Sequence, residues 1–516
     1  MLAILFLGAI LRLYNLDRYP LWYDEASVAL EEKGISSLAP VHKFMDPGFY
    51  VEKQGYLYLY NHVFIYYWKK IFGNSVFNLR LSSVIWGILG LYMFYWLARC
   101  IYNKNVALIS VFLLAISPFH LQYSQELRPY AAVSFFSLAA FFALFNILIG
   151  KGKKYWVFFV VANTLNIYLL STTFPILLAQ IIFVLILKPE RKKLLGLSAA
   201  VLAILLLTIP VVLIIIPNLV IMLTKSVDLD LTEFPLWWQK IGFVNLLFTL
   251  RNFSLGYYVN FFSPVGLITP LILFFLFVRG NYKDSSKPRV LFNTTMLAFP
   301  ILSIFLVSKL VKVFYIDRYF LCLLPIYILV AARGLDYYRK WLRYVLLIVI
   351  TALTSVGIRN YYLDLLPSDY QQHIAVMPKN NEISQLAGFL AENYKSGDKV
   401  FCTSKLMIFS LKFYLNGLEE RKTDKIVKEL ISEGDEGKLI WFDDKNGLRQ
   451  FFYKDSRPIS VISQPFRSST IDSRIWVING LFDSRLAAVE KLKKDFVLKE
   501  KRDFKGLELY LFVLQG

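Results

Sequence analysis

The stretch LSSVIWGILGLYMFYWLA, residues 81–98, runs for eighteen residues without a charged side chain. A helix rises about 1.5 Å per residue, so this run covers most of the ~30 Å hydrocarbon layer of a bilayer. Similar apolar runs recur along the first 359 residues. We predict about eleven membrane-spanning helices, at roughly 78–98, 105–121, 130–149, 155–173, 193–216, 262–279, 290–308, 318–332 and 341–358, with shorter candidates at 1–14 and 174–187.

The composition of the whole chain also predicts a membrane protein. Of its 516 residues, 57% are hydrophobic and 17% aromatic, above the roughly 45–50% apolar share of soluble domains. The net charge of +20 is compatible with nucleic acid, but Lys and Arg lie at the ends of the predicted spans, which favours anionic lipid head groups as partners and not nucleic acid. Cys100, Cys322 and Cys402 lack the spacing of a metal site or a disulfide framework.

Five short gaps between the predicted spans are rich in Lys and Arg. They lie at 99–104, 151–154, 188–193, 279–289 and 333–343. Because such loops stay in the cytoplasm, the pattern predicts a cytoplasmic N-terminus and a multi-pass protein of the plasma membrane. The gaps that then face outward contain the unusual polar elements, at 15–77, 118–129, 171–174, 217–261, 309–317 and after 359.

Two adjacent acids, Asp24 and Glu25, lie in the first outward gap within the sequence WYDEA. One interpretation is structural: an exposed loop pair, or an N-cap for a helix through ASVALEEKG. The other is chemical: one carboxylate takes a proton from an acceptor hydroxyl while the second orients that hydroxyl or binds a metal. The chemical role requires partial shielding from water, to which the neighbours Trp22 and Tyr23 would contribute at the head-group level.

Two further outward segments pair a carboxylate with a base. Glu52 and Lys53 precede an aromatic-rich stretch that we expect to form a helix in the membrane interface. Glu126 and Arg128 lie in SPFHLQYSQELRPYAAV, residues 117–133, where Arg suits phosphate because its fork donates two parallel hydrogen bonds. The structural alternatives are a solvated surface pair for Glu52 and Lys53, and a polar turn before Pro129 for the second segment.

Three basic residues crowd the outer end of a late span, where the positive-inside rule disfavours them. They are Lys309, Lys312 and Arg318, in SKLVKVFYIDRYFLCLLP. An anion should offset them, and a lipid phosphate is the simplest candidate. The alternative is that the side chains snorkel to outer head groups.

The order of four blocks resembles a known family. WYDEA, FGNSVFNLRLSSVIWGILGLYMFYWLAR, SPFHLQYSQELRPYA and DRYFLCLLPIYILVAARGL together resemble the dolichyl-phosphate-mannose-protein mannosyltransferase-like glycosyltransferases of the GT-C fold, which include the aminoarabinose transferases of lipid A. The resemblance covers about residues 1–375. It implies a polytopic α-helical protein that uses a polyprenyl-phosphate sugar as donor, because nucleotide sugars are absent outside the membrane.

The resemblance also assigns roles to residues. It implies that Asp24 is the catalytic base with Glu25 beside it, and it matches Glu126 and Arg128 to an E-x-R-P-Y block and Arg318 to an R-Y block. Because basic residues are disfavoured on the outer face, we expect Arg128, Arg318 and Lys312 to hold the donor phosphate. A Glu-Lys-Pro element of some members supplies a metal ligand and a phosphate contact; here it corresponds to Glu52 and Lys53, with Gln54 in place of the proline. If a divalent metal (Mg, Mn or Zn) is used, its candidate ligands are Glu52 and Glu126.

After residue 360 the composition becomes polar and charged. Helical and strand periods alternate through SQLAGFLAENYKSG, DKVFCTS, MIFSLKFYLNG, IVKELISEG, GKLIWFDD, RIWVING, RLAAVEKLKKDF and GLELYLFVL. This alternation predicts a soluble α/β domain at 360–516 on the outer face. It follows a transmembrane catalytic domain at 1–359 with outer loops at 15–77 and 217–261. Since the second domain contains no phosphate-binding or metal-ligand motif, we expect it to bind the acceptor or support the loops.

The sequence therefore predicts an inverting membrane glycosyltransferase. Displacement at the anomeric carbon by one base-activated hydroxyl needs no second carboxylate as nucleophile. The acceptor class, whether protein, lipid or glycan, is left open by the sequence. The alternative is a transporter or flippase of lipid-linked glycans, which would need ionisable groups near the middle of its spans, and the predicted spans are almost free of Asp and Glu.

Overall fold

The structure is a computed structural model that forms two compact units. It describes residues 1–30, 60–224, 241–311, 315–367, 381–395, 398–402, 407–416, 438–443, 447–452, 474–480, 493 and 496–514. The first unit contains Met1–Leu16 and the described part of Tyr56–Met377, and the second contains the described parts of Asp17–Glu32 and Pro378–Gly516. The segment with Asp24 and Glu25 therefore groups with the C-terminal residues.

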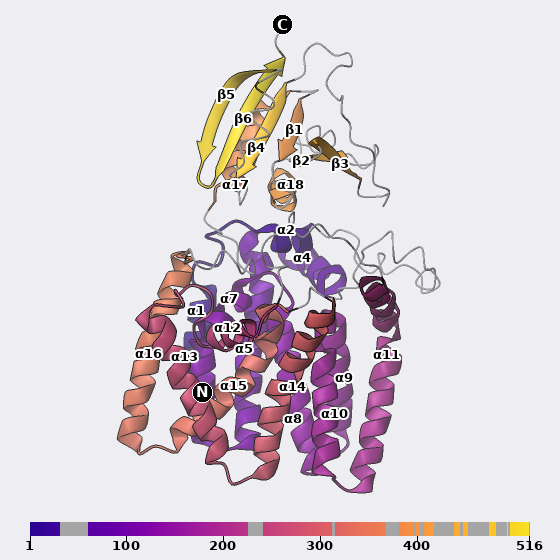
Figure 1. The fold of residues 1–516 in the computed structure, drawn as a ribbon, viewed down its shortest axis with the longest axis vertical. Helices are drawn as coiled ribbons and strands as arrows, with labels where there is room; N and C mark the ends of the chain where they lie inside the picture. The colour runs from indigo at the N-terminus through magenta and orange to yellow at the C-terminus, as the bar shows by residue number, and fades with distance from the viewer. Residues whose placement is uncertain are drawn as a thin grey trace. The chain divides into compact units, whose positions relative to one another are not determined.

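The first unit is built of helices, most of which run along one common direction (Figure 1). Every predicted apolar segment is helical over most of its length. In chain order the helices are α1 (Leu2–Leu13), the π-helix Tyr60–Ile65, α4 (Tyr66–Phe72), α5 (Val76–Ile101), α6 (Lys104–Ala115), α7 (Pro118–Gln125), α8 (Tyr130–Leu148), α9 (Lys154–Leu169), a 3-10 turn (Ser171–Thr173), α10 (Phe174–Leu187), α11 (Arg191–Thr224), α12 (Val244–Leu255), α13 (Pro264–Tyr282), α14 (Lys287–Val311), a 3-10 helix (Asp317–Leu323), α15 (Leu324–Asp336) and α16 (Lys340–Tyr362).

Seven helical stretches among the described residues are long and apolar enough to cross a membrane. A bent pair formed by α6 and α7 raises the number to eight if it counts as one span, and Leu2–Leu13 and Ser171–Leu187 are shorter apolar helices. Spanning helices are favoured in lipid because they satisfy their backbone groups internally. The prediction of a polytopic α-helical membrane protein is confirmed.

Two predicted loops contain more helix than the sequence indicated. The outer loop predicted at 217–261 begins inside α11, which ends at Thr224, and it contains the whole of α12. In the segment 118–129, residues Pro118–Gln125 form α7, and all eight are buried. The turn before Pro129 is therefore confined to residues 126–128.

Helices α13 and α15 approach closely at glycines. A Cβ built on Gly334 would lie 1.9 Å from the carbonyl oxygen of Leu276, and one built on Gly280 would lie 2.1 Å from that of Val330. Small residues allow such close backbone contact between membrane helices, where dispersion and packing provide most of the attraction. The contact helps to hold α15, whose N-terminal end continues from the 3-10 helix that contains Arg318.

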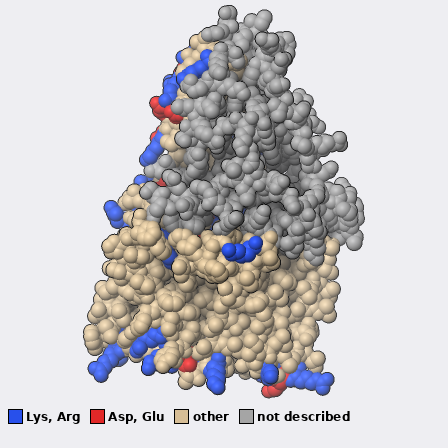
Figure 2. Space-filling view, viewed as in Figure 1, with Lys and Arg blue, Asp and Glu red and all other residues tan. Residues whose placement is uncertain are grey.

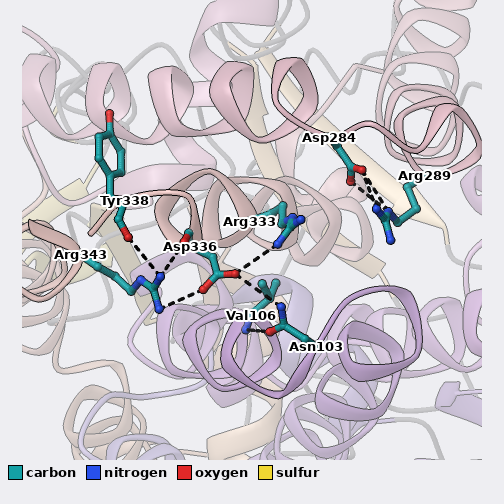
Figure 3. Close-up of polar contacts among 8 residues, drawn as sticks. All are labelled: Asn103, Val106, Asp284, Arg289, Arg333, Asp336, Tyr338 and Arg343. Carbon is teal, nitrogen blue, oxygen red and sulfur yellow. Dashed lines mark hydrogen bonds and ion pairs between the residues drawn. The ribbon is translucent and has the colours of Figure 1, made fainter. Parts of the chain in front are cut away.

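The basic turns gather at one end of the helical unit. Figure 2 shows Lys and Arg along the lower edge of this unit, below a broad band with little charge. In Figure 3, Asp336 accepts from two arginines, Arg333 at 3.2 Å and Arg343 at 3.0 Å. Asp284 binds Arg289 at 2.8 Å; burial alone would raise the pKa of Asp284, but the hydrogen bonds from Arg289 and a backbone N–H leave it below its ordinary value. These ion pairs tie neighbouring turns together at this end.

The second unit contains a four-stranded sheet whose strands lie in the order β1 (Lys399–Cys402), β4 (Ile475–Gly480), β6 (Leu507–Leu514) and β5 (Phe496–Phe504). β1 and β4 are parallel, and the other two pairings are antiparallel. Alternate residues of β4 face opposite sides: Trp476 and Ile478 pack against the two helices α17 and α18, while Ile475 and Val477 pack against β5 and β6. The elements are α2 (Tyr23–Ala29), α17 (Ile383–Asn393), β1 (Lys399–Cys402), α18 (Ile408–Asn416), β2 (Lys438–Asp443), β3 (Gly447–Phe452), β4 (Ile475–Gly480), β5 (Phe496–Phe504) and β6 (Leu507–Leu514).

The contact between α13 and α15 yields a first prediction. Gly334→Ala should lower the thermal unfolding temperature in detergent, because the new methyl group forces two backbones apart at a cost of about 1–3 kcal/mol. Gly90→Ala is the matched control, since its methyl would lie 3.9 Å from the nearest side-chain atom, an ordinary contact. Equal unfolding temperatures for the two variants would contradict the prediction.

Candidate functional site

The candidate site begins at a break between α6 and α7. The two helices meet at an angle of 60°. Ser117 begins α7 by accepting a hydrogen bond from the His120 N–H at 3.3 Å, and Pro118 occupies a first-turn position where its missing N–H costs nothing. The break turns α7 into the protein, where its C-terminal residue leads directly to Glu126.

Arg12 of α1 holds this break. Its Nη1 donates to the carbonyl oxygens of Gly8 at 3.0 Å and Ala115 at 3.1 Å. Its Nη2 lies 2.8 Å from Nδ1 of His120, and since a guanidinium has only donors, Nδ1 must accept and the His120 proton lies on Nε2. Ser124, one turn along α7, also contacts Nδ1 at 3.1 Å. The polar side of α7 is therefore bound to α1.

Gln125, the last residue of α7, joins three helices. Its Nε2 donates to the carbonyl oxygens of Arg12 and Tyr14, each at 2.9 Å, where α1 ends and its carbonyls lack helical partners. Its Oε1 accepts from the Tyr361 hydroxyl of α16 at 2.7 Å. The residue next to Glu126 is thus held by both the first and the last helix of the unit.

The chain reverses tightly after α7. The N–H of Arg128 donates to the carbonyl oxygen of Glu126 at 2.7 Å, a bond across two residues that is typical of a γ-turn. Glu126 is 1% exposed and Leu127 is fully buried. Pro129 then begins α8. The turn presents a buried carboxylate and an arginine within three residues, as the family block predicts.

Tyr130 brings the two predicted phosphate-binding arginines together. The guanidinium carbon of Arg128 lies 5.8 Å from the centre of the Tyr130 ring, and that of Arg318 lies 5.7 Å from the same centre. Such distances are typical of cation–π contacts. Tyr123 of α7 and Tyr319 also pack near this ring, with centroid distances of 5.2 and 6.4 Å. Two arginines 190 positions apart in sequence therefore share one aromatic residue.

A polar network that the sequence does not indicate lies beside Arg318. Asp317, 7% exposed, accepts from Thr249 and Asn252 of α12. The hydroxyl groups of Tyr257, just after α12, and Tyr123 lie 3.3 Å apart. The acid before Arg318 was visible in the sequence, but α12 was predicted as loop, so its partners were not.

Asp24 and Glu25 lie in the first turn of α2, within the second unit. Trp22 is the N-cap of this helix and has no side-chain cap hydrogen bond, so the interpretation of Asp24 as the N-cap is wrong. Asp24 is half-buried and Glu25 is fully buried, which excludes an exposed loop pair. The Leu21 N–H donates to the Tyr414 hydroxyl of α18 at 2.8 Å, so α2 packs on the C-terminal part of its unit. The acids have the partial shielding that the chemical role requires.

Several predicted residues lie outside the described part of the chain or away from the arginine pair. Glu52, Lys53 and Lys312 lie outside the described residues. Lys309 is exposed, and its ammonium lies over the rings of Phe243 at 5.8 Å and Phe305 at 5.6 Å. Within the described ranges no group of three or more His, Cys, Asp or Glu could hold a metal ion. The described residues alone thus do not provide the metal site that the resemblance implies.

Comparisons with known proteins concern the family and the fold. Residues 62–220 match the family model described as dolichyl-phosphate-mannose-protein mannosyltransferase. The structure is similar to ArnT from Cupriavidus metallidurans in the apo state, with a TM-score of 0.57 and 11% identity over 99% of this chain and 97% of that chain. The same protein bound to undecaprenyl phosphate gives a TM-score of 0.54 and 12% identity over the same shares. No curated protein matches the sequence.

The chain has the GT-C fold. Its resemblance to the dolichyl-phosphate-mannose-protein mannosyltransferase-like glycosyltransferases is confirmed by the family match and by the structural likeness over almost the whole chain. An oligosaccharyltransferase of Archaeoglobus fulgidus, tethered to an acceptor peptide, is a weaker likeness, with a TM-score of 0.48 and 14% identity over 80% of this chain and 63% of that chain. The family segment of this GT-C chain includes α5 to α8, and with them Glu126, Arg128 and Tyr130.

Proposed function

We propose that this GT-C protein is a membrane glycosyltransferase that transfers a sugar from a polyprenyl-phosphate donor to an acceptor hydroxyl. The observation that carries the proposal is the pair Arg128 and Arg318 on one tyrosine ring, next to the buried Glu126. Guanidinium forks suit a phosphate. The neighbour bound to undecaprenyl phosphate has the same fold, which supports a polyprenyl phosphate as the ligand of this end of the bundle.

In the proposed reaction Asp24 is the base. Its carboxylate takes the proton of the acceptor hydroxyl while that oxygen forms a bond to the anomeric carbon of the sugar. The bond from the anomeric carbon to the donor phosphate oxygen breaks, and the electron pair leaves with the polyprenyl phosphate. Attack opposite the leaving group inverts the anomeric configuration, so no covalent sugar–enzyme intermediate forms. Glu25, as the neighbour, orients the acceptor or the base.

Other residues complete the proposed donor site. Lys53 and Lys312 would add positive charge for the phosphate. A divalent metal, with Glu52 and Glu126 as candidate ligands, would supply charge stabilisation at the leaving phosphate when bound. The described carboxylate among these, Glu126, is buried within two residues of Arg128.

The charge distribution supports an outward-facing site. The basic turns of the helical unit gather at one end (Figure 2), and the positive-inside rule assigns that end to the cytoplasm. Helix α16 starts at this end with Lys340, so its last residue, Tyr362, lies at the opposite end. We therefore propose a plasma-membrane protein with the donor site and the 360–516 domain outside, where a lipid-linked donor is required.

A transporter or flippase of lipid-linked glycans is the alternative function. Ionisable residues inside spans often mark transport paths. The fully buried Arg12 is such a residue, but it binds two carbonyl oxygens and His120, which gives it a structural role. Purified protein in detergent distinguishes the two functions, because a transferase still forms product there and a transporter has no second compartment.

Removal of the proposed base gives the second prediction. Asp24→Asn keeps the size of the side chain but removes its proton affinity, so turnover should fall by roughly 10²- to 10⁴-fold. The assay measures sugar transfer by purified protein from a polyprenyl-phosphate sugar. Asp17→Asn is the matched control, because Asp17 is exposed and lies in the same unit. Near-normal turnover in a folded Asp24→Asn protein would refute the assignment.

Replacement of the arginine forks gives the third prediction. Arg128→Lys and Arg318→Lys should each weaken donor binding despite the retained charge, because an ammonium cannot donate two parallel hydrogen bonds to a phosphate. Acceptor affinity should change much less, since the phosphate belongs to the donor. Arg359→Lys, an exposed arginine in the last turn of α16, is the control. If Lys served as well as Arg at both positions, these side chains would only snorkel to head groups.

Orientation gives the fourth prediction. A reporter that is active only in the cytoplasm should be silent when fused to the C-terminus, because the basic turns place α16 so that the chain leaves it outside. The same reporter fused after a truncation at Lys153, in the basic turn between α8 and α9, should be active and serves as the control. A strong signal from the C-terminal fusion would reverse the topology.

A further inference from the structure

Asp317, the residue before Arg318, makes two short polar contacts. The two oxygens of the Asp317 carboxylate accept from different side chains of α12: Oδ1 from the Thr249 hydroxyl at 2.5 Å and Oδ2 from the Asn252 amide at 2.6 Å. Hydrogen bonds to an ionised acceptor are shorter and about twice as strong as neutral ones. With only 7% of its surface exposed, Asp317 forms these bonds with little competition from water.

The hydrogen bonds of Asp317 are part of a longer chain of hydrogen bonds. The single hydroxyl hydrogen of Thr249 has two acceptors in reach, Asp317 at 2.5 Å and the Asn245 carbonyl oxygen at 3.0 Å, and we assign it to the nearer one. The Tyr315 hydroxyl at 2.6 Å then donates to the Thr249 oxygen. Asn252 accepts from Nη1 of Arg251 at 2.8 Å, and the same Nη1 donates to the Gly256 carbonyl oxygen. A continuous chain of hydrogen bonds thus joins Tyr315 to the C-terminal end of α12.

Helix α12 is well suited to receive the carboxylate. Thr249 and Asn252 are three residues apart, so they lie on the same face of the helix, and both are buried. The 3-10 helix that begins at Asp317 follows Ile316, whose backbone is extended. The hydrogen bonds from α12 therefore anchor the start of that 3-10 helix, and Arg318 is its second residue.

We propose that Asp317 is a positioning residue for donor binding, which aims Arg318 at the donor phosphate by anchoring its backbone to Thr249 and Asn252 of α12. This inference rests on the proposed function and adds α12 to the donor site. Asp317 touches no substrate in this scheme. It acts through Arg318, whose guanidinium lies 5.7 Å from the centre of the Tyr130 ring. A bidentate contact tolerates little angular error, so loosening the backbone at 317 misaligns the fork.

The test measures donor affinity and turnover separately. In Asp317→Asn the new NH2 group faces the NH2 group of Asn252. The hydrogen bond between these two side chains is therefore lost, while the bond from Thr249 remains. Donor binding, measured with a short-chain polyprenyl-phosphate sugar and purified protein, should weaken about tenfold, while turnover at saturating donor changes less than about twofold. Thr249→Val, which removes the other bond, should weaken binding about threefold. Asp336→Asn at the basic end should leave donor affinity unchanged.

Two double variants separate positioning from general stability. Asp317→Asn combined with Asn252→Asp exchanges the acid and the amide. The bond from Thr249 to residue 317, the bond between residues 317 and 252, and the bond from Arg251 to residue 252 can then all form, so donor affinity should recover. In an Arg318→Ala background, Asp317→Asn should weaken binding by less than about twofold, because the residue that it positions is gone. Full additivity of the two single effects would show a purely structural role and overturn the inference.

The outcomes of this experiment separate the inference from the proposed function. Wild-type affinity in the folded Asp317→Asn protein, with weak binding in Arg318→Ala, overturns the inference and leaves the proposed donor site intact. A wild-type protein that does not bind the polyprenyl-phosphate sugar overturns the proposed function and the inference with it. If Asp317→Asn does not fold, Thr249→Val and the exchanged pair decide, and wild-type affinity in Thr249→Val counts against the inference.

Discussion

Helix α6 ends at Ala115, about 18 Å along the helix from its basic end at Lys104. At such an end, carbonyl groups lack the N–H donors that a continuing helix would supply. Lipid offers no replacement, so a break at this depth needs a partner inside the protein. Arg12 supplies it through Ala115, and the same guanidinium binds His120 on α7. The turn with Glu126 and Arg128 directly follows α7. By holding α7, the buried Arg12 side chain therefore also helps to fix the position of Glu126 and Arg128.

Hydropathy predicted the helices well because lipid imposes a single rule on every span. It did not indicate the break in the 105–121 segment, because the hydrogen bonds from Arg12 that hold the break come from over a hundred residues away. Helix α12 and its contacts to Asp317 were missed for the same reason: a polar residue that binds a distant segment leaves no periodic signal. In the second unit, β5 was missed because FVLKEKRDF is mostly charged and only Phe496 is fully buried.

The candidate residues show the complementary limit. Residue type and the positive-inside rule selected Arg128 and Arg318 separately, but nothing in the sequence indicated that both would contact Tyr130. The expectation of shielding for Asp24 agrees with its half-buried place in α2. Its grouping with the C-terminal unit was not predictable, because the contact between Leu21 and Tyr414 joins segments almost four hundred residues apart.

Two arginines near one ring suit the charge that develops in the proposed reaction. The donor is a phosphodiester with one negative charge, whereas the leaving polyprenyl phosphate is a monoester that carries about −1.5 to −2 near neutral pH. Two guanidinium groups near one ring repel each other, because both are positively charged. The leaving phosphate offsets that repulsion more fully than the donor does. In the proposed reaction the arginine pair would therefore bind the transition state more tightly than the ground state, and only such a difference accelerates the chemical step.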